Sequence, residues 1–150
     1  MTDKKYPWQK YPEIWKTESA FMSYIRGGIR RGLWNRYPVK LEYIKNNREK
    51  IPNPNPNGRV KEVWGGTCYI TGEKLPLKDL EVDHRKGNLS LKSADDLQKF
   101  VEGLLYLDES DLGFISKQAH KIKNYSERMG ISFEQAVIEK DIIHFANKLT

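Results

Sequence analysis

The sequence predicts an α+β protein in which a basic helical arm, residues 1–58, precedes a core of short strands and helices, residues 59–150. Apolar residues recur at spacing four in the arm, which is typical of an amphipathic helix. Short apolar segments separated by turn residues follow, as expected for strands. Near the end of the chain, Ser132 and Gln135 form a Ser-x-x-Gln capping box that opens a last helix. Helix and strand signals thus both occur, which defines the class.

The arm begins with a segment rich in aromatic residues and proline, residues 1–16. Proline fixes φ and disfavours helix before it, so this segment is expected to be extended to about Pro12, with its rings packed on the body rather than stacked on bases. Thr17 is the expected N-cap of a helix. The helix carries an apolar stripe of Phe21, Ile25, Ile29 and Leu33.

A second helix is expected over residues 39–48. Proline and asparagine then alternate over residues 51–58, which excludes helix and central strand and predicts a stiff linker or exposed loop ending in an Asn-Gly turn. We place the boundary between arm and core there.

The core elements follow in order. Strands are expected over residues 60–64 and 67–70, a turn over 71–74, and an extended segment leading to Asp83. Later elements are a helix from Ser93 to about Leu104, a short strand at 105–107, a helix carrying Ile115, Ala119 and Ile122 and ending at Gly130, and a terminal helix to about Lys148. No internal repeat is visible.

Composition excludes several classes of protein. Hydrophobic residues make up 38% of the chain and charged residues 31%, and no apolar run is long enough to span a bilayer. The start of the chain lacks the apolar core of a secretion signal. Cys68 is the single cysteine, which excludes an internal disulfide and fits a reducing compartment. We therefore expect a cytoplasmic protein with no membrane partner.

Charge is unevenly distributed along the chain. Residues 1–61 hold fourteen Lys and Arg against five Asp and Glu, whereas residues 62–150 hold twelve against fifteen. A basic front half suggests that it grips an anionic polymer such as nucleic acid, and a solvated basic helix face is the alternative. The candidate phosphate-binding side chains of the arm are Arg26, Arg30, Arg31 and Arg36.

The candidate chemistry lies between Leu80 and Lys123. Asp83 and His84 are adjacent at the end of a predicted strand, and His120 lies on a predicted helix with Lys123 at i+3. A carboxylate and imidazoles of this kind can bind a divalent cation and take a proton from water, as metal-assisted phosphodiester hydrolysis requires. Taken singly, each of these residues is more often a surface side chain, and His144 on the last helix is taken as one; it is their joint arrangement that indicates a site.

Together these residues resemble the HNH endonucleases, of the small type carried by bacteriophages. Val82-Asp83-His84 resembles the first motif of that family, Asp111-Leu112 its central Asn-Leu, and His120-Lys121-Ile122-Lys123 its closing His-x-x-Lys. Trp15 to Glu18, Phe21, Ile25-Arg26, Ile29-Arg30 and Trp34 resemble its N-terminal helix, and residues 125–136 also resemble phage members. The resemblance covers most of the chain.

The resemblance implies a ββα-metal core that cleaves DNA and leaves 5′-phosphate ends. Asp83 and His120 would bind the metal, with Mg²⁺ or Mn²⁺ expected and Zn²⁺ or Ni²⁺ as alternatives. His84 would be the general base. The resemblance further implies that Lys123, Arg85 and Lys86 contact phosphate. In a phage-encoded protein the compartment would be the host cytoplasm, and we expect a monomer or a weak dimer.

Two departures from the family stand out. Asp111 replaces the central Asn, and as a carboxylate it either joins the catalytic metal site or merely caps the next helix. Many relatives have a four-cysteine zinc knuckle, whose positions here are Cys68, Thr71, Ser116 and Ala119, so no structural zinc is expected. Apolar packing would replace it, by Tyr69, Ile70, Leu80, Val82, Ile115 and Ile122. A rival interpretation is a DNA-binding or phage accessory protein that keeps the fold without cleaving, and a weaker one is a nuclease acting on RNA.

Overall fold

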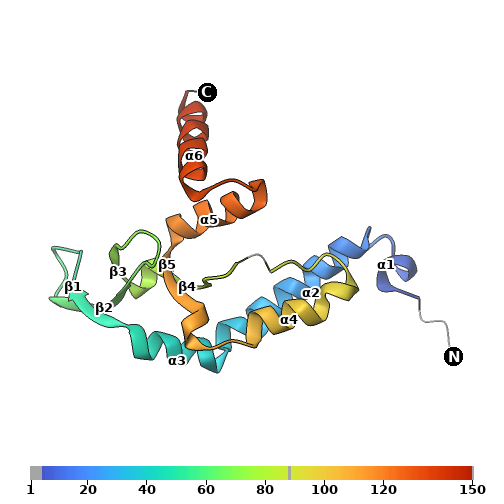
Figure 1. The fold of residues 1–150 in the computed structure, drawn as a ribbon, viewed down its shortest axis with the longest axis horizontal. Coiled ribbons are helices and arrows are strands. Elements are labelled where there is room, and N and C mark those ends of the chain that lie inside the picture. Colours follow the sequence, from blue (N-terminus) through green and yellow to red (C-terminus); the bar gives the residue numbers. More distant parts are fainter. Residues whose placement is uncertain (1–4, 88, 150) are drawn as a thin grey trace. The chain divides into compact units, whose positions relative to one another are not determined.

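The structure is a computed structural model that describes residues 5–87 and 89–149, so the expectations for residues 1–4 and 88 lie outside it. It confirms the α+β class, with helices predominating and two small antiparallel sheets (Figure 1). The chain forms two compact units, residues 1–42 with 88–110 and residues 43–87 with 111–150. No helix among the described residues is both long and apolar enough to cross a membrane.

The first unit is helical. It contains α1 (Pro7–Lys10), α2 (Glu18–Gly32), η1 (Trp34–Arg36), the start of α3 (Pro38–Asn47), η3 (Ala94–Asp96), α4 (Leu97–Leu105) and most of η4 (Glu109–Asp111). Thr17 caps α2 as predicted, because its hydroxyl accepts a hydrogen bond from the Ala20 amide at 3.1 Å. Ser93 forms a capping box with Asp96 before α4, also as predicted.

One expectation for the arm is wrong and another is right only in part. The segment before Pro12 contains the short helix α1, because Pro7 stands at its first position, where proline is tolerated. On α2 the stripe residues Phe21, Ile25 and Ile29 are partly buried as predicted, whereas Leu33 is exposed and the buried residue is Met22. The packing role of the aromatic residues is confirmed, because the Trp15 ring lies 5.2 Å from that of Phe21 and 4.9 Å from that of Tyr24.

The second unit contains a three-stranded sheet, a two-stranded sheet and two helices. Strands β1 (Glu49–Pro52), β2 (Glu62–Thr67) and β3 (Lys74–Pro76) pair in that order, η2 (Leu77–Asp79) follows, and β4 (Leu80–His84) pairs with β5 (Leu112–Ser116). Helices α5 (Lys117–Met129) and α6 (Phe133–Lys148) complete it. All strand pairs are antiparallel.

The Pro/Asn segment is a hairpin loop rather than an interdomain linker. It joins β1 to β2, and Asn53 holds it by donating from its side chain to the Val60 carbonyl at 2.8 Å. Ile51, at the start of the segment, is buried with the second unit. The chain therefore divides after residue 42, within α3, and not at the predicted residue 58.

Residues 67–70 and 112–116 differ most from prediction. Only Thr67 of the predicted second strand is paired, because the chain turns after Cys68 through Gly72 at φ 76°. The expected strand at 105–107 is absent from these described residues, where α4 ends. Leu112–Ser116 was expected to begin the helix of His120 but is strand β5, buried at every position. A continuous apolar run fits either element, and here pairing with β4 decides.

The core of the second unit is close-packed around β5. Phe114 lies against Gly66 of β2, where an added Cβ would come within 2.6 Å of the ring. The Phe114 amide donates to the Tyr43 hydroxyl at 3.2 Å. Of the six residues expected to replace a zinc knuckle, Leu80, Val82 and Ile115 are buried, whereas Tyr69, Ile70 and Ile122 are only partly so.

Candidate functional site

Strand β4 supplies the acidic residues of the site. Successive side chains of a strand point to opposite faces, so Glu81 and Asp83 share one face and His84 lies on the other. Asp83 is only 8% exposed and is paired with Gly113 of β5. A carboxylate buried to this degree requires partners.

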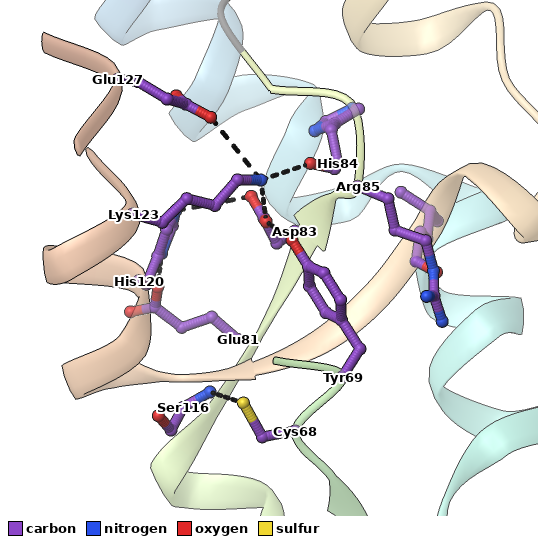
Figure 2. A network of polar contacts seen from close by, with 11 residues as sticks. Cys68, Tyr69, Glu81, Asp83, His84, Arg85, Ser116, His120, Lys123 and Glu127 are labelled. Carbon is purple, nitrogen blue, oxygen red and sulfur yellow. Dashed lines mark hydrogen bonds and ion pairs between the residues drawn. The ribbon is translucent and has the colours of Figure 1, made fainter. Parts of the chain in front are cut away.

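The two oxygens of the Asp83 carboxylate have different partners (Figure 2). Oδ2 accepts a hydrogen bond from the Tyr69 hydroxyl at 2.7 Å and is also bound by the Lys123 ammonium group. Oδ1 faces Nε2 of His120 at 3.6 Å. We call Tyr69, Glu81, Asp83, His120 and Lys123 the Asp83 cluster.

Tyr69 reaches Asp83 because of a glycine in β5. Its ring lies over Gly113, where an added Cβ would come within 2.6 Å of the Tyr69 ring. Burial, the hydrogen bond to Asp83 and the charge of that carboxylate raise the pKa of the Tyr69 hydroxyl well above its ordinary value of 10.0. Tyr69 is therefore a persistent donor that fixes the orientation of the carboxylate.

Helix α5 supplies the basic residues of the cluster. It begins after Ser116, whose hydroxyl accepts from the Ala119 amide at 3.0 Å. His120 and Lys123, three residues apart, lie on the face turned toward β4. The His120 Nδ1 atom contacts the Glu81 carboxylate. The ring is therefore held at one nitrogen while its other nitrogen faces Asp83.

Lys123 lies inside the cluster rather than at the surface. Its side chain is 13% exposed, and its ammonium group donates to the His84 carbonyl at 2.8 Å and lies 3.9 Å from the Glu127 carboxylate. The ammonium group of Lys123 is thus bound to Asp83, and its predicted phosphate contact stays a prediction.

His84 is separated from the other two candidate residues. It is the last residue of β4, it is 9% exposed, and Figure 2 shows its ring directed away from the Asp83 carboxylate. The structure therefore brings together Asp83 and His120 but not the ring of His84.

Asp111 lies beside the end of β4. Its carbonyl accepts a hydrogen bond from the Arg85 amide at 2.8 Å, and its side chain is exposed. The alternative that it caps a helix is wrong, because the next element is strand β5. The structure does not bring its carboxylate together with Asp83 and His120 in a common group.

The predicted phosphate-binding residues fall in both units. Arg26, Arg31 and Arg36 of the first unit are exposed, and Arg30 is partly buried. In the second unit Lys86 is exposed. The exposed Arg85 donates from Nε to the Leu112 carbonyl at 2.8 Å and lies over the Tyr69 ring. Arg85 is thus positioned at the edge of the Asp83 cluster.

The fit of a divalent cation can be tested on Asp83 and His120. Among the described residues, no group of three or more His, Cys, Asp or Glu side chains converges as a metal site. Two ligands about 2.1 Å from one cation lie roughly 3.0–3.6 Å apart. The 3.6 Å between Oδ1 and Nε2 reaches the upper end of that range. Mg²⁺ commonly takes one or two protein ligands and completes its shell with water and phosphate.

Sequence reasoning missed Glu81 and Tyr69. Glu81 had a signal, since it lies two residues before Asp83 and must share its face of a strand. Tyr69 had only the indirect signal of Gly113, because a glycine inside a strand often marks a close approach.

A second group of residues occupies the four positions that the sequence resemblance aligned with a zinc knuckle. Cys68 is fully buried, and its sulfur accepts a hydrogen bond from the Ser116 amide at 3.4 Å. Burial opposes ionisation, but hydrogen bonds from the Thr71 side chain and from nearby amides lower the pKa of the Cys68 thiol. We call Cys68, Thr71, Ser116 and Ala119 the Cys68 cluster. It holds the turn after β2 against the start of α5.

Comparison of the chain with models of protein families, with curated proteins and with solved structures finds no match.

Proposed function

We propose that the protein is a divalent-metal-dependent HNH-type endonuclease that hydrolyses DNA phosphodiester bonds. The observation that carries the proposal is the arrangement of His120, whose Nδ1 contacts Glu81 while Nε2 faces Asp83 Oδ1 at 3.6 Å. A histidine that binds a metal usually donates its other ring nitrogen to a carboxylate, which fixes its tautomer and orientation. The element order β4, β5, α5 supports a ββα core.

In this proposal Asp83 and His120 would hold the cation, most simply Mg²⁺ or Mn²⁺. When bound, the cation would neutralise negative charge on the phosphate and on the departing oxygen. Tyr69 and Lys123 keep Oδ2 of Asp83 occupied and so direct Oδ1 toward His120. Glu81 is a positioning residue that acts through His120.

His84 is the proposed general base. Because it ends β4, a phosphate lying across that end would contact both faces of the strand. The imidazole would then take the proton of the attacking water from the face opposite Asp83. The exposed arginines of the first unit, Arg26, Arg31 and Arg36, are proposed to bind the phosphate backbone, with an affinity that falls as salt rises.

The test compares variants of the proposed metal site with a variant of a histidine outside it. We expect Asp83→Asn and His120→Gln to weaken Mn²⁺ binding at least about tenfold in calorimetry and to slow plasmid nicking about a hundredfold or more. Glu81→Gln should weaken Mn²⁺ binding by about tenfold through loss of orientation. The control His144→Gln changes an exposed histidine of α6 and should change neither quantity.

His84→Ala should slow nicking while Mn²⁺ affinity is retained. A His84→Ala protein that cuts as fast as the parent would remove the general-base assignment alone. Unchanged Mn²⁺ affinity in both Asp83→Asn and His120→Gln would refute the metal site.

A second candidate function is a protein that binds DNA without cutting it. The contact between Lys123 and Asp83 favours this candidate, because the ammonium group already neutralises the carboxylate that a cation would need. Such a protein would shift DNA in a gel and leave plasmid intact at every concentration of Mg²⁺ or Mn²⁺. Nicking of RNA but not of DNA would instead identify an RNA nuclease.

A further inference from the structure

Helix α6 has one covered face. Ala136 is fully buried, the Glu139 carboxylate accepts a hydrogen bond from the Tyr125 hydroxyl of α5 at 2.7 Å, and the Lys140 ammonium group lies 5.0 Å from the Tyr125 ring. Figure 1 shows α5 beside the start of α6 within the second unit. The face turned to α5 is therefore mainly polar, with a small residue at its centre.

The opposite face of α6 is apolar and exposed. The large side chains on this side, which we call the Ile138 stripe, are Ile138, Ile142 and Phe145 of α6 and Leu149 at its C-cap, with exposed fractions of 53%, 62%, 65% and 73%. They are spaced by four, three and four residues, which is the heptad pattern of a helix that packs against another helix. A solvated helix face would not carry four such residues in register.

We propose that the Ile138 stripe pairs two copies of this chain through an antiparallel contact between their α6 helices. In an antiparallel pair, Ile138 packs against Leu149 of the partner subunit and Ile142 against Phe145 of the partner subunit. The same two contacts recur in the other half of the pair. The surface is thus self-complementary, as a two-fold dimer requires.

Charge favours the antiparallel arrangement over the parallel one. With the apolar residues in register, Asp141 falls beside Lys148 of the partner subunit, and Lys148 beside Asp141 of the partner subunit. These positions flank the stripe, where interhelical ion pairs set orientation. In a parallel pair Asp141 would instead fall beside Ala146 of the partner subunit, and this ion pair would be absent.

The interface is small. A helix of sixteen residues is about 24 Å long and presents about two heptads. An interface of this size belongs to the low end of specific contacts, so we expect a dimer that dissociates on dilution.

Sedimentation equilibrium of the full chain tests the pairing. The chain should change from monomer to dimer with rising concentration in the micromolar range, and Ile142→Glu should weaken dimerisation roughly a hundredfold, because it places a carboxylate in each half of the seam. The matched control His144→Glu places the same carboxylate two residues away on an exposed position off the stripe and should leave dimerisation unchanged.

A charge exchange tests orientation without altering the apolar residues. Asp141→Lys or Lys148→Asp alone should weaken the dimer several-fold, and the double variant should restore it. A chain that stays monomeric at all concentrations overturns the proposal, which would mean that the stripe is solvated or packs within its own chain. A dimer that is indifferent to the single charge changes overturns the antiparallel arrangement.

Discussion

The Asp83 and Cys68 clusters share helix α5 and the turn after β2, and they take their third element from the paired strands β4 and β5 respectively, yet they are chemically opposite. In the Asp83 cluster, a buried carboxylate gathers a hydroxyl, an ammonium group and an imidazole. In the Cys68 cluster, a buried thiol gathers an amide and a hydroxyl and carries no charged side chain. The same unit therefore holds a buried charged cluster at one place and an uncharged packing contact at the other.

The Cys68 cluster stabilises the core by packing and hydrogen bonds. Four ligands around a zinc ion would cross-link the turn and the helix directly. Here one sulfur with its hydrogen bonds, together with Ile115, Phe114 and Leu80, does so by packing. Substitutions in the Cys68 cluster should therefore change the free energy of unfolding alone, whereas substitutions in the Asp83 cluster should also change the affinity for Mn²⁺.

The largest expected effect comes from Lys123→Met. It leaves the Asp83 carboxylate buried with only Tyr69 and His120, which should lower the free energy of unfolding by about 2–4 kcal/mol in urea denaturation. Under the proposed function, loss of the ammonium group should also raise Mn²⁺ affinity, so that Mn²⁺ stabilises the variant more than the parent.

The matched control for Lys123→Met is Lys74→Ala. Lys74 forms an ion pair with Glu49 at 3.4 Å, but the two side chains are 62% and 42% exposed. Water screens such a pair, so the change should be below about 0.5 kcal/mol. Equal losses in the two variants would show that burial does not distinguish the pairs.

A smaller effect is expected from Cys68→Ala. It removes a fully buried sulfur and its hydrogen bonds, which should cost about 1–2 kcal/mol of unfolding free energy. Mn²⁺ affinity should be unchanged, because the thiol does not contact the Asp83 cluster. A loss of Mn²⁺ binding without unfolding would contradict the separation of the two clusters.

The smallest effect is expected from Tyr69→Phe, and it depends on pH. Loss of the hydrogen bond to Asp83 should cost about 1 kcal/mol near neutral pH. Because the pKa of Tyr69 is raised in the folded state, its contribution is complete below the ordinary value of 10.0 and is lost as pH rises through the folded value. The unfolding free energies of the parent and of Tyr69→Phe should therefore converge in strongly alkaline buffer.

The contribution of Cys68 to the free energy of unfolding should depend on pH in the opposite direction. Its pKa is lowered in the folded state, so its contribution is present above the ordinary value of 9.0 and is lost as pH falls through the folded value. The gap between the parent and Cys68→Ala should widen as pH rises toward 9. Denaturation midpoints measured from neutral to alkaline pH give both slopes, and slopes of the same sign would contradict the comparison.

The sequence predicted best what is encoded locally. The caps at Thr17, Ser93 and Ser132 and the end of α5 at Gly130 lie as expected, because each depends on a few neighbouring residues. Prediction from the sequence was wrong where the structure of a segment depends on pairing with a segment distant in the chain. Strand β5 is fixed by pairing with β4, and the Pro/Asn segment is a hairpin loop only because β1 and β2 pair across it.

The candidate site was predicted in part for the same reason. Asp83 and His120 were paired correctly from the motif, and the structure places them face to face. The ion pair of Lys123 with Asp83 and the contact of Tyr69 were missed, because burial and the approach of a ring over Gly113 depend on contacts distant in sequence.

The connection between β4 and β5 has a consequence for biogenesis. His84 and Leu112 are paired, yet residues 88–110, which belong to the other compact unit, separate them along the chain. During synthesis on the ribosome, strand β4, which carries Asp83, would therefore stay unpaired until the whole intervening segment and β5 had been synthesised. Closing so long a loop is slow. The Asp83 cluster would thus form only after the last third of the chain, which carries β5 and α5, had emerged.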